Sequence, residues 1–183
     1  MTIEELKNLT TANDAKKLQA LWTILDHYKW GVLASHQKDE ANNDIAVPSF
    51  IFFASLNNLI LFVTPPNAAF RQYENVVAGK VFSFLVANTE LFDSDPQQYA
   101  RFLIRGKVDP CEDMKREYYL SICRQKIPNN PVLGTNPDVL VLTPTFVQHG
   151  LRSSVSEGYE AVTVEVTLPE GSLDLEGNYV EFL

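Results

Sequence analysis

Thr64 and Arg71 are the residues whose types and spacing point most directly to chemistry. Thr64 ends the apolar stretch "LILFVT", and Arg71 follows seven positions later, after Pro65 and Pro66. Two prolines here are typical of a helix start, where backbone N–H groups lack partners. Such N–H groups, a hydroxyl and a guanidinium can together hold a phosphate dianion. The alternative is that Thr64 only ends a strand and that Arg71 is a solvated helix residue.

Motifs for the commonest nucleotide, hydrolase and zinc sites are absent from the sequence, among them G-x-G-x-x-G, G-x-S-x-G, H-E-x-x-H and paired C-x-x-C. His27, His36 and His149 are isolated from one another, so no metal site is predicted. Cys111 and Cys123 fall in one predicted helix, about 18 Å apart along its axis, which is too far for a disulfide. The sequence indicates no catalytic residue.

Composition and charge restrict the class of protein. The chain has 183 residues, 45% of them hydrophobic, and carries 15 Lys and Arg against 23 Asp and Glu, for a formal net charge of −8. This size suits one globular domain with a substantial core. The negative charge repels nucleic-acid backbones, so no nucleic-acid partner is predicted. Neither a secretion signal nor a membrane span is apparent, which predicts a cytoplasmic protein with no membrane partner.

Two amphipathic helices are predicted at the N-terminus. Thr2 and Glu5 form a capping-box pattern before the first helix. Leu18, Leu21 and Leu25 repeat at helical spacing in a second helix, from about Asn13 to Tyr28. Its apolar side requires a sheet or another helix to cover it.

The pattern then changes to that of β-strands. A polar turn, "QKDEANND", joins strands Trp30–His36 and Ile45–Phe53, and Pro48 indicates an edge or a bulge in the second of them. Further strands are predicted at 59–64, 80–87, 100–108, 138–148 and 160–168, with helices around Phe70–Val77 and over 111–126.

The order of these elements favours an α+β fold, an antiparallel split β-barrel of about seven strands flanked by helices. A doubly wound parallel sheet is disfavoured because strands and helices do not alternate. The predicted organisation is a single domain over residues 1–183, with N-terminal helices over 1–28, a barrel core over 29–167 and an acidic tail over 168–183.

From about Leu18 to Gln148, the chain resembles the pyridoxamine 5'-phosphate oxidase-like, FMN-binding split-barrel superfamily. The resemblance rests on the order of a helix, "WGVLAS", a polar turn, "VPSFIFF", "LILFVT", an Arg-containing short helix, "KVFSFLVA" and "FLIRGKV". It implies a homodimer with FMN in clefts at the subunit interface. The early hairpin would then form the barrel wall on which the flavin ring lies.

The resemblance also implies site residues. Ser35, Ser49 and Phe50 match positions that often line the flavin, and Thr64 and Arg71 match positions that often hold its phosphate.

On the fifth strand, Lys107 matches a basic position facing the pyrimidine edge of the flavin, with Arg105 as the next choice. A cation there would stabilise negative charge that develops on reduction. The chain departs from the family at Ala69-Phe70-Arg71, where many relatives have a Ser-containing phosphate motif. It also lacks the Arg-rich C-terminal substrate motif of the vitamin-B6 oxidases, which argues against that activity.

The leading hypothesis is an FMN-dependent oxidoreductase that transfers hydride to or from an unknown small-molecule substrate or electron donor. One alternative is a split-barrel protein that binds or degrades haem, with His36 or His149 as the iron ligand. The other is a cofactor-free dimeric binding protein, favoured by the missing hydroxyl at Ala69.

Overall fold

Seven strands and four α-helices make up the described part of the chain, which in the computed structural model comprises residues 1–66, 70, 72–87, 99–155 and 158–180. The helices are α1 (Ile3–Thr10), α2 (Asp14–Leu25), α3 (Tyr73–Val77) and α5 (Asp113–Lys126). The strands are β1 (Trp30–Lys38), β2 (Asp44–Leu56), β3 (Leu59–Thr64), β4 (Val81–Ala87), β5 (Tyr99–Pro110), β6 (Asp138–Val155) and β7 (Gly158–Thr167).

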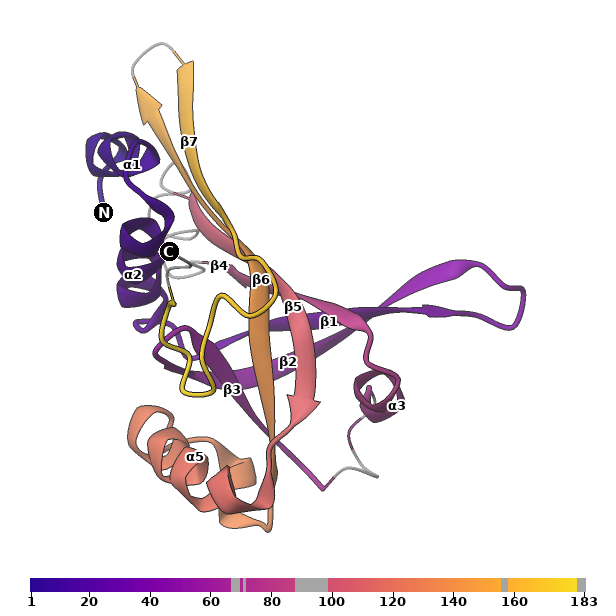
Figure 1. The fold of residues 1–183 in the computed structure, drawn as a ribbon. Helices are drawn as coiled ribbons and strands as arrows, with labels where there is room; N and C mark the ends of the chain where they lie inside the picture. The colour runs from indigo at the N-terminus through magenta and orange to yellow at the C-terminus, as the bar shows by residue number, and fades with distance from the viewer. Residues whose placement is uncertain (67–69, 71, 88–98, 156–157, 181–183) are drawn as a thin grey trace.

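All seven strands belong to one antiparallel sheet in the order β3-β2-β1-β4-β5-β6-β7 (Figure 1). An additional pairing between β3 and β6 closes six of the strands into a barrel, with β7 added along the far part of β6. The predicted split-barrel fold is thereby confirmed. No helix in the described ranges is long and apolar enough to cross a membrane.

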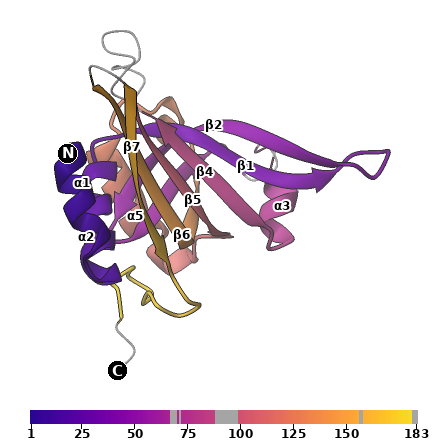
Figure 2. The same ribbon diagram turned by 90° about the horizontal axis from the view of Figure 1, so that it is seen from above.

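Helices α1 and α2 cover the inner side of the sheet (Figures 1 and 2). The predicted capping box at Thr2 and Glu5 is present at the start of α1, and Asn13 caps α2. Strand side chains alternate between two faces, so each strand sends every second residue inward. The result is a core of fully buried leucines and phenylalanines, including Leu18, Leu21, Phe53, Phe62, Phe82, Phe84 and Phe102.

Helix α5 covers a separate part of the outer side of the barrel. Leu61 on β3 and Val139 on β6 pack there against Leu120 and Cys123 of α5. Cys111, predicted inside this helix, precedes it, because its N–H bonds the carbonyl oxygen of Val139 at 2.9 Å and so continues the sheet. Both cysteines are free, as predicted.

The β1–β2 hairpin projects from the barrel (Figures 1 and 2). Pro48 pairs with Ala34 without a register shift, and β2 pairs with β3 only from Phe53 to Leu56. Pro48 therefore lies where β2 has a neighbour on one side only, which is the predicted edge. The bulge of the sheet lies elsewhere, between Arg105 and Gly106 of β5.

The acidic segment after β7 is attached to the β2–β3 turn. The backbone N–H and the side-chain amide of Asn58 both donate to the carbonyl oxygen of Gly177, at 3.0 and 2.7 Å. The side chain of Asn57 donates to the carbonyl oxygen of Glu176 at 2.7 Å. Strand β6 extends beyond its predicted end at Gln148, because β5 and β7 both pair with it there.

Candidate functional site

Two buried side-chain amides, at the start of the short helix α3 and within it, form hydrogen bonds to strands at the end of the barrel. The side-chain NH₂ of Gln72 donates to the carbonyl oxygen of Leu33 at 3.0 Å and to Ser49 Oγ at 2.8 Å. The side-chain NH₂ of Asn75 donates to Ser35 Oγ at 2.7 Å. The sequence analysis did not predict a role for Gln72 and Asn75. Two amide side chains among apolar residues at a helix start were the pattern that could have indicated one.

These hydrogen bonds determine whether the hydroxyl groups of Ser35 and Ser49 are available to a ligand. Ser35 is fully buried beneath α3, so its hydroxyl serves the packing of this helix. Ser49 is half-buried, and its oxygen accepts from Gln72. Since a hydroxyl donates one hydrogen bond as well as accepting, Ser49 retains its proton for a ligand. Of the two predicted serines, Ser49 is the one whose side chain remains partly exposed.

Thr64 lies at the end of β3, as predicted, and is 1% exposed. Its Oγ1 atom has no hydrogen-bond partner among the residues that the structure describes. A buried hydroxyl without a partner is unfavourable by about 1–3 kcal/mol, and such groups commonly mark a position where a ligand or water binds. Arg71 and Ala69, the other parts of the predicted phosphate site, lie outside the described residues.

An exposed aromatic pair occupies the outer face of β1 and β2. The ring of Phe50 is 76% exposed and stacks on Trp30, with 5.2 Å between ring centroids. Strand register places Phe52, Leu85 and Val81 on the same face. We call these five residues, Trp30, Phe50, Phe52, Val81 and Leu85, the outer apolar face; each is more than a third exposed.

Arg105 and Lys107 lie on this side of the sheet, on β5. Arg105 is exposed and its guanidinium lies 5.0 Å from the ring centroid of Phe146. Lys107 forms a salt bridge of 2.8 Å with Asp109, whose hydrogen bond and charge raise the pKa of Lys107. Because Asp109 already offsets its charge, Lys107 is a weaker candidate than Arg105 for a flavin edge.

His149 and His36, the two histidines proposed as haem ligands, have different environments. His149 is 2% exposed and packs on Phe102, with 4.3 Å between ring centroids. Burial lowers the pKa of His149 to about 4. His149 is thus a neutral core residue, enclosed on the inner side of the sheet. His36 is exposed on β1 and is the accessible one of the two.

Comparison with known proteins finds likeness in structure alone. No protein-family model and no curated protein sequence matches the chain. A haem-binding protein of Mycobacterium smegmatis has a similar structure, with a TM-score of 0.55 and 16% identity over 80% of this chain. This chain spans only 57% of that protein's length.

This chain matches two further solved structures over most of their length. A Listeria innocua protein described as a pyridoxamine 5'-phosphate oxidase has a TM-score of 0.53 and 17% identity, over 72% of this chain and 95% of that one. An FAD-binding protein of Mesorhizobium loti has a TM-score of 0.51 and 12% identity, over 71% of this chain and 89% of that one. The chain therefore has the split-barrel fold of the pyridoxamine 5'-phosphate oxidase-like structures, as its sequence resemblance predicted.

Proposed function

We propose that this chain is a homodimeric flavoprotein that binds FMN at the subunit interface and performs redox chemistry on a small molecule. The observation that carries the proposal is the outer apolar face, where Phe50 and Trp30 present a stacked aromatic surface. Aromatic and aliphatic side chains of this kind suit a flat heteroaromatic ring.

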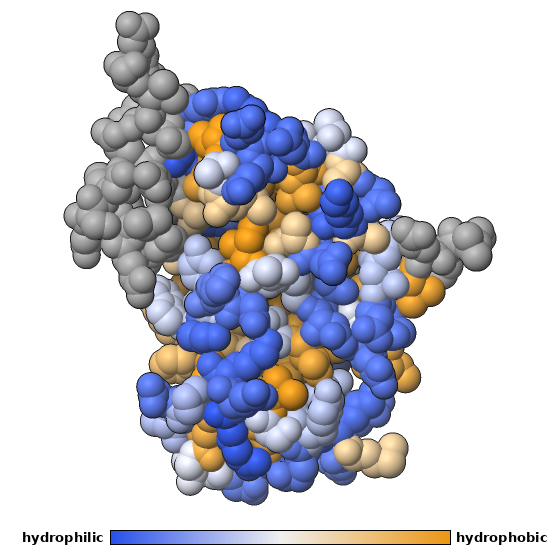
Figure 3. Space-filling model, turned by 90° about the vertical axis from the view of Figure 1, so that its left-hand side faces the viewer, coloured by the Kyte–Doolittle hydropathy of each residue, from blue (hydrophilic) through white to orange (hydrophobic). Residues whose placement is uncertain are grey.

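A second copy of the chain would cover this face. Exposed apolar side chains gathered on one surface are typical of a protein interface. Helix α5 already covers the neighbouring outer surface of β3 and β6, whereas no described helix packs on Trp30, Phe50 or Leu85. The surface on the side of α1 and α2 is mostly polar by contrast (Figure 3). Two-fold pairing through the outer apolar face would bury it in both subunits.

The residues present fit FMN at three points. Phe50 can contact the ring, and the hydroxyl of Thr64, which has no partner within the described ranges, would supply a donor for the phosphate. The guanidinium of Arg105 forms no salt bridge with any described carboxylate, so it can stabilise negative charge at the ring edge. When bound, FMN supplies a centre that accepts and returns hydride, while the protein binds, orients and sets the electrostatics.

The solved structures of similar fold support a flavin. One binds FAD and another is described as a pyridoxamine 5'-phosphate oxidase, in agreement with a flavin on this fold. Another binds haem, so haem is the alternative cofactor that the experiment must distinguish from a flavin. Enclosure of His149 in the core leaves only His36 of the two predicted haem ligands accessible.

The test is the visible spectrum of the purified chain before and after FMN is added and excess is removed. We expect flavin bands retained at one FMN per subunit. A Soret band from copurified haem, or no retained chromophore, would contradict the proposal, and the latter would favour a cofactor-free binding protein. Phe50→Ala should weaken FMN binding and dimerisation, whereas Met114→Ala, which removes a 92% exposed side chain from α5, should change neither.

The phosphate contacts have their own variants. Thr64→Val removes the hydroxyl at nearly constant volume and should weaken FMN binding, while Thr64→Ser should preserve it. Arg71→Ala should weaken FMN binding by about 1.5–3 kcal/mol through loss of a charge-assisted pair. Unchanged affinity in Arg71→Ala would remove Arg71 from the phosphate site.

A further inference from the structure

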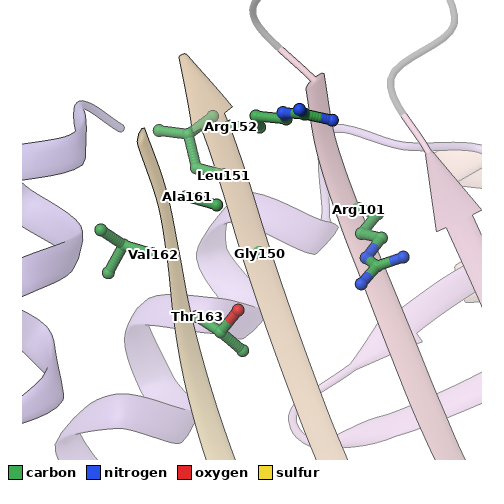
Figure 4. A pocket seen from close by; sticks show the side chains of 7 residues that line it. All are labelled: Arg101, Gly150, Leu151, Arg152, Ala161, Val162 and Thr163. Carbon is green, nitrogen blue, oxygen red and sulfur yellow. The ribbon is translucent and has the colours of Figure 1, made fainter. Parts of the chain in front are cut away.

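A pocket of about 330 Å³ lies on β5, β6 and β7, and none of the described residues of the predicted flavin site lines it (Figure 4). Its polar lining comes from Arg101, Arg152 and Thr163, with Gly150 between them. Two guanidiniums and a hydroxyl are all hydrogen-bond donors, so the pocket is suited to a ligand that accepts hydrogen bonds.

The strand register explains how these residues meet. Arg101 pairs with Gly150, and Gly150 pairs with Thr163, so the three form one row across three strands. Arg152 lies two positions beyond Gly150 and hence on the same face. A Cβ atom at Gly150 would lie 3.5 Å from Thr163 Oγ1 and 3.9 Å from Arg101 Nε. The missing side chain thus leaves an open floor flanked by a guanidinium and a hydroxyl.

The charges around the pocket favour an anion. The whole chain has a formal charge of −8, yet none of the described residues that line this pocket is a carboxylate. Two nearby carboxylates of β7 are held by other groups: Glu160 forms a salt bridge with Lys7, and Glu165 accepts from the side-chain amide of Gln148 at 2.7 Å. No described carboxylate forms a salt bridge with Arg101.

The backbone beneath the pocket is fixed from the inner side of the sheet. His149, next to Gly150, is buried, stacks on Phe102 and hydrogen-bonds the backbone of Arg101. Donors held by a rigid support lose less conformational entropy when a ligand binds.

We propose that this pocket binds the phosphate or carboxylate group of a small molecule. Arg101 and Arg152 would donate charge-assisted hydrogen bonds, Thr163 would donate its hydroxyl proton, and Gly150 provides the space. The planar guanidinium matches either oxyanion with two parallel hydrogen bonds. The proposal goes beyond the flavin assignment and does not depend on it.

The test is a titration of the isotope-labelled full chain with sodium phosphate and, separately, with sodium succinate, at constant ionic strength. The amide NMR signals of Gly150 and Thr163 report on the pocket. Saturable shifts of both signals are expected with at least one of the two anions, and the one that binds more tightly identifies phosphate or carboxylate as the preferred group. The absence of saturable shifts at both residues with both anions would overturn the proposal.

Two pairs of variants separate the pocket from general effects. Arg101→Gln should weaken anion binding about tenfold, whereas Arg124→Gln, which removes the same charge from an exposed site on α5, should leave it unchanged. Gly150→Ala should weaken binding by filling the floor, whereas Gly134→Ala, where an added Cβ meets no atom within 4 Å, should not. Equal weakening by Arg101→Gln and Arg124→Gln would contradict a specific site.

The flavin and the anion proposals fail separately. Phosphate-induced shifts at the amide of Thr64, with no shift of Gly150 or Thr163 from either phosphate or succinate, would support a flavin-phosphate site while overturning the pocket. Shifts at Gly150 and Thr163 in a chain that retains no FMN would support the pocket while overturning the flavin.

Discussion

Asn75 on α3 and Ser35 on β1 are joined by a buried hydrogen bond of 2.7 Å, between residues forty positions apart. Gln72 makes a second connection of the same kind to Ser49. The two amides attach a five-residue helix, which is too short to be stable alone, to the wall of the barrel. Through them, the segment that follows Thr64 is held against the strand that carries Phe50.

Ser35→Ala should destabilise the fold by about 1–3 kcal/mol, because the buried amide of Asn75 then lacks its acceptor. Asn75→Ala and the double variant complete a double-mutant cycle, measured by urea unfolding. We expect the double variant to lose less stability than the two single losses combined. Strict additivity would show that the hydrogen bond contributes nothing beyond the packing of the separate side chains.

Gly106→Ala should destabilise the barrel strongly, by about 3 kcal/mol or more, because the added atom has no room at the bulge. Its Cβ would lie 2.1 Å from the carbonyl oxygen of Thr143 and 2.8 Å from Cα of Pro144, both backbone atoms. Gly134→Ala serves as the matched control. A melting temperature for Gly106→Ala equal to that of the control would show that β5 and β6 can separate at the bulge without cost.

His149 should make the stability depend on pH between about 4 and 6.5. Burial lowers the pKa of His149 from 6.5 to about 4, so in this range the unfolded chain binds a proton that the folded chain does not. Stability is therefore fully present above the unfolded pKa and decreases as the pH falls toward the folded pKa, by about 3 kcal/mol in all.

The measurement is urea unfolding at pH 7 and pH 5 for the natural chain and for His149→Gln. We expect the variant to be less stable at pH 7, since it loses the stacking on Phe102, but to lose less stability between the two pH values. An unchanged pH dependence in His149→Gln would assign the effect to other groups.

Arg105→Gln should lower FMN affinity by about threefold to tenfold, since it removes an exposed cation from the outer side of β5. Lys107→Gln should have a smaller effect, because Asp109 already pairs with that ammonium group. The FMN affinities of both variants are measured by titration, and they can be compared directly because each variant removes one positive charge. A larger loss in Lys107→Gln would restore Lys107 as the residue nearest the ring.

The class of fold follows from local patterns in the amino-acid sequence. Helical spacing of Leu18, Leu21 and Leu25 identified α2, because this periodicity follows from backbone geometry alone. Runs of β-branched and aromatic residues between turn residues identified the strands, and the last strand also showed alternation of period two. The end of β3 at Thr64 and the edge at Pro48 were also predictable, since proline restricts the backbone and cannot donate to a sheet.

Which candidate residues remain available to a ligand depends instead on how the chain packs in three dimensions. Ser35 and Ser49 look alike in sequence, but α3 buries the first and leaves the second half-exposed. Arg105 and Lys107 both carry a positive charge, but Asp109 engages only Lys107. Arg101 and Thr163 are sixty-two positions apart and meet only through pairing with Gly150. Exposure and partners depend on contacts between distant segments, and local sequence patterns do not encode such contacts.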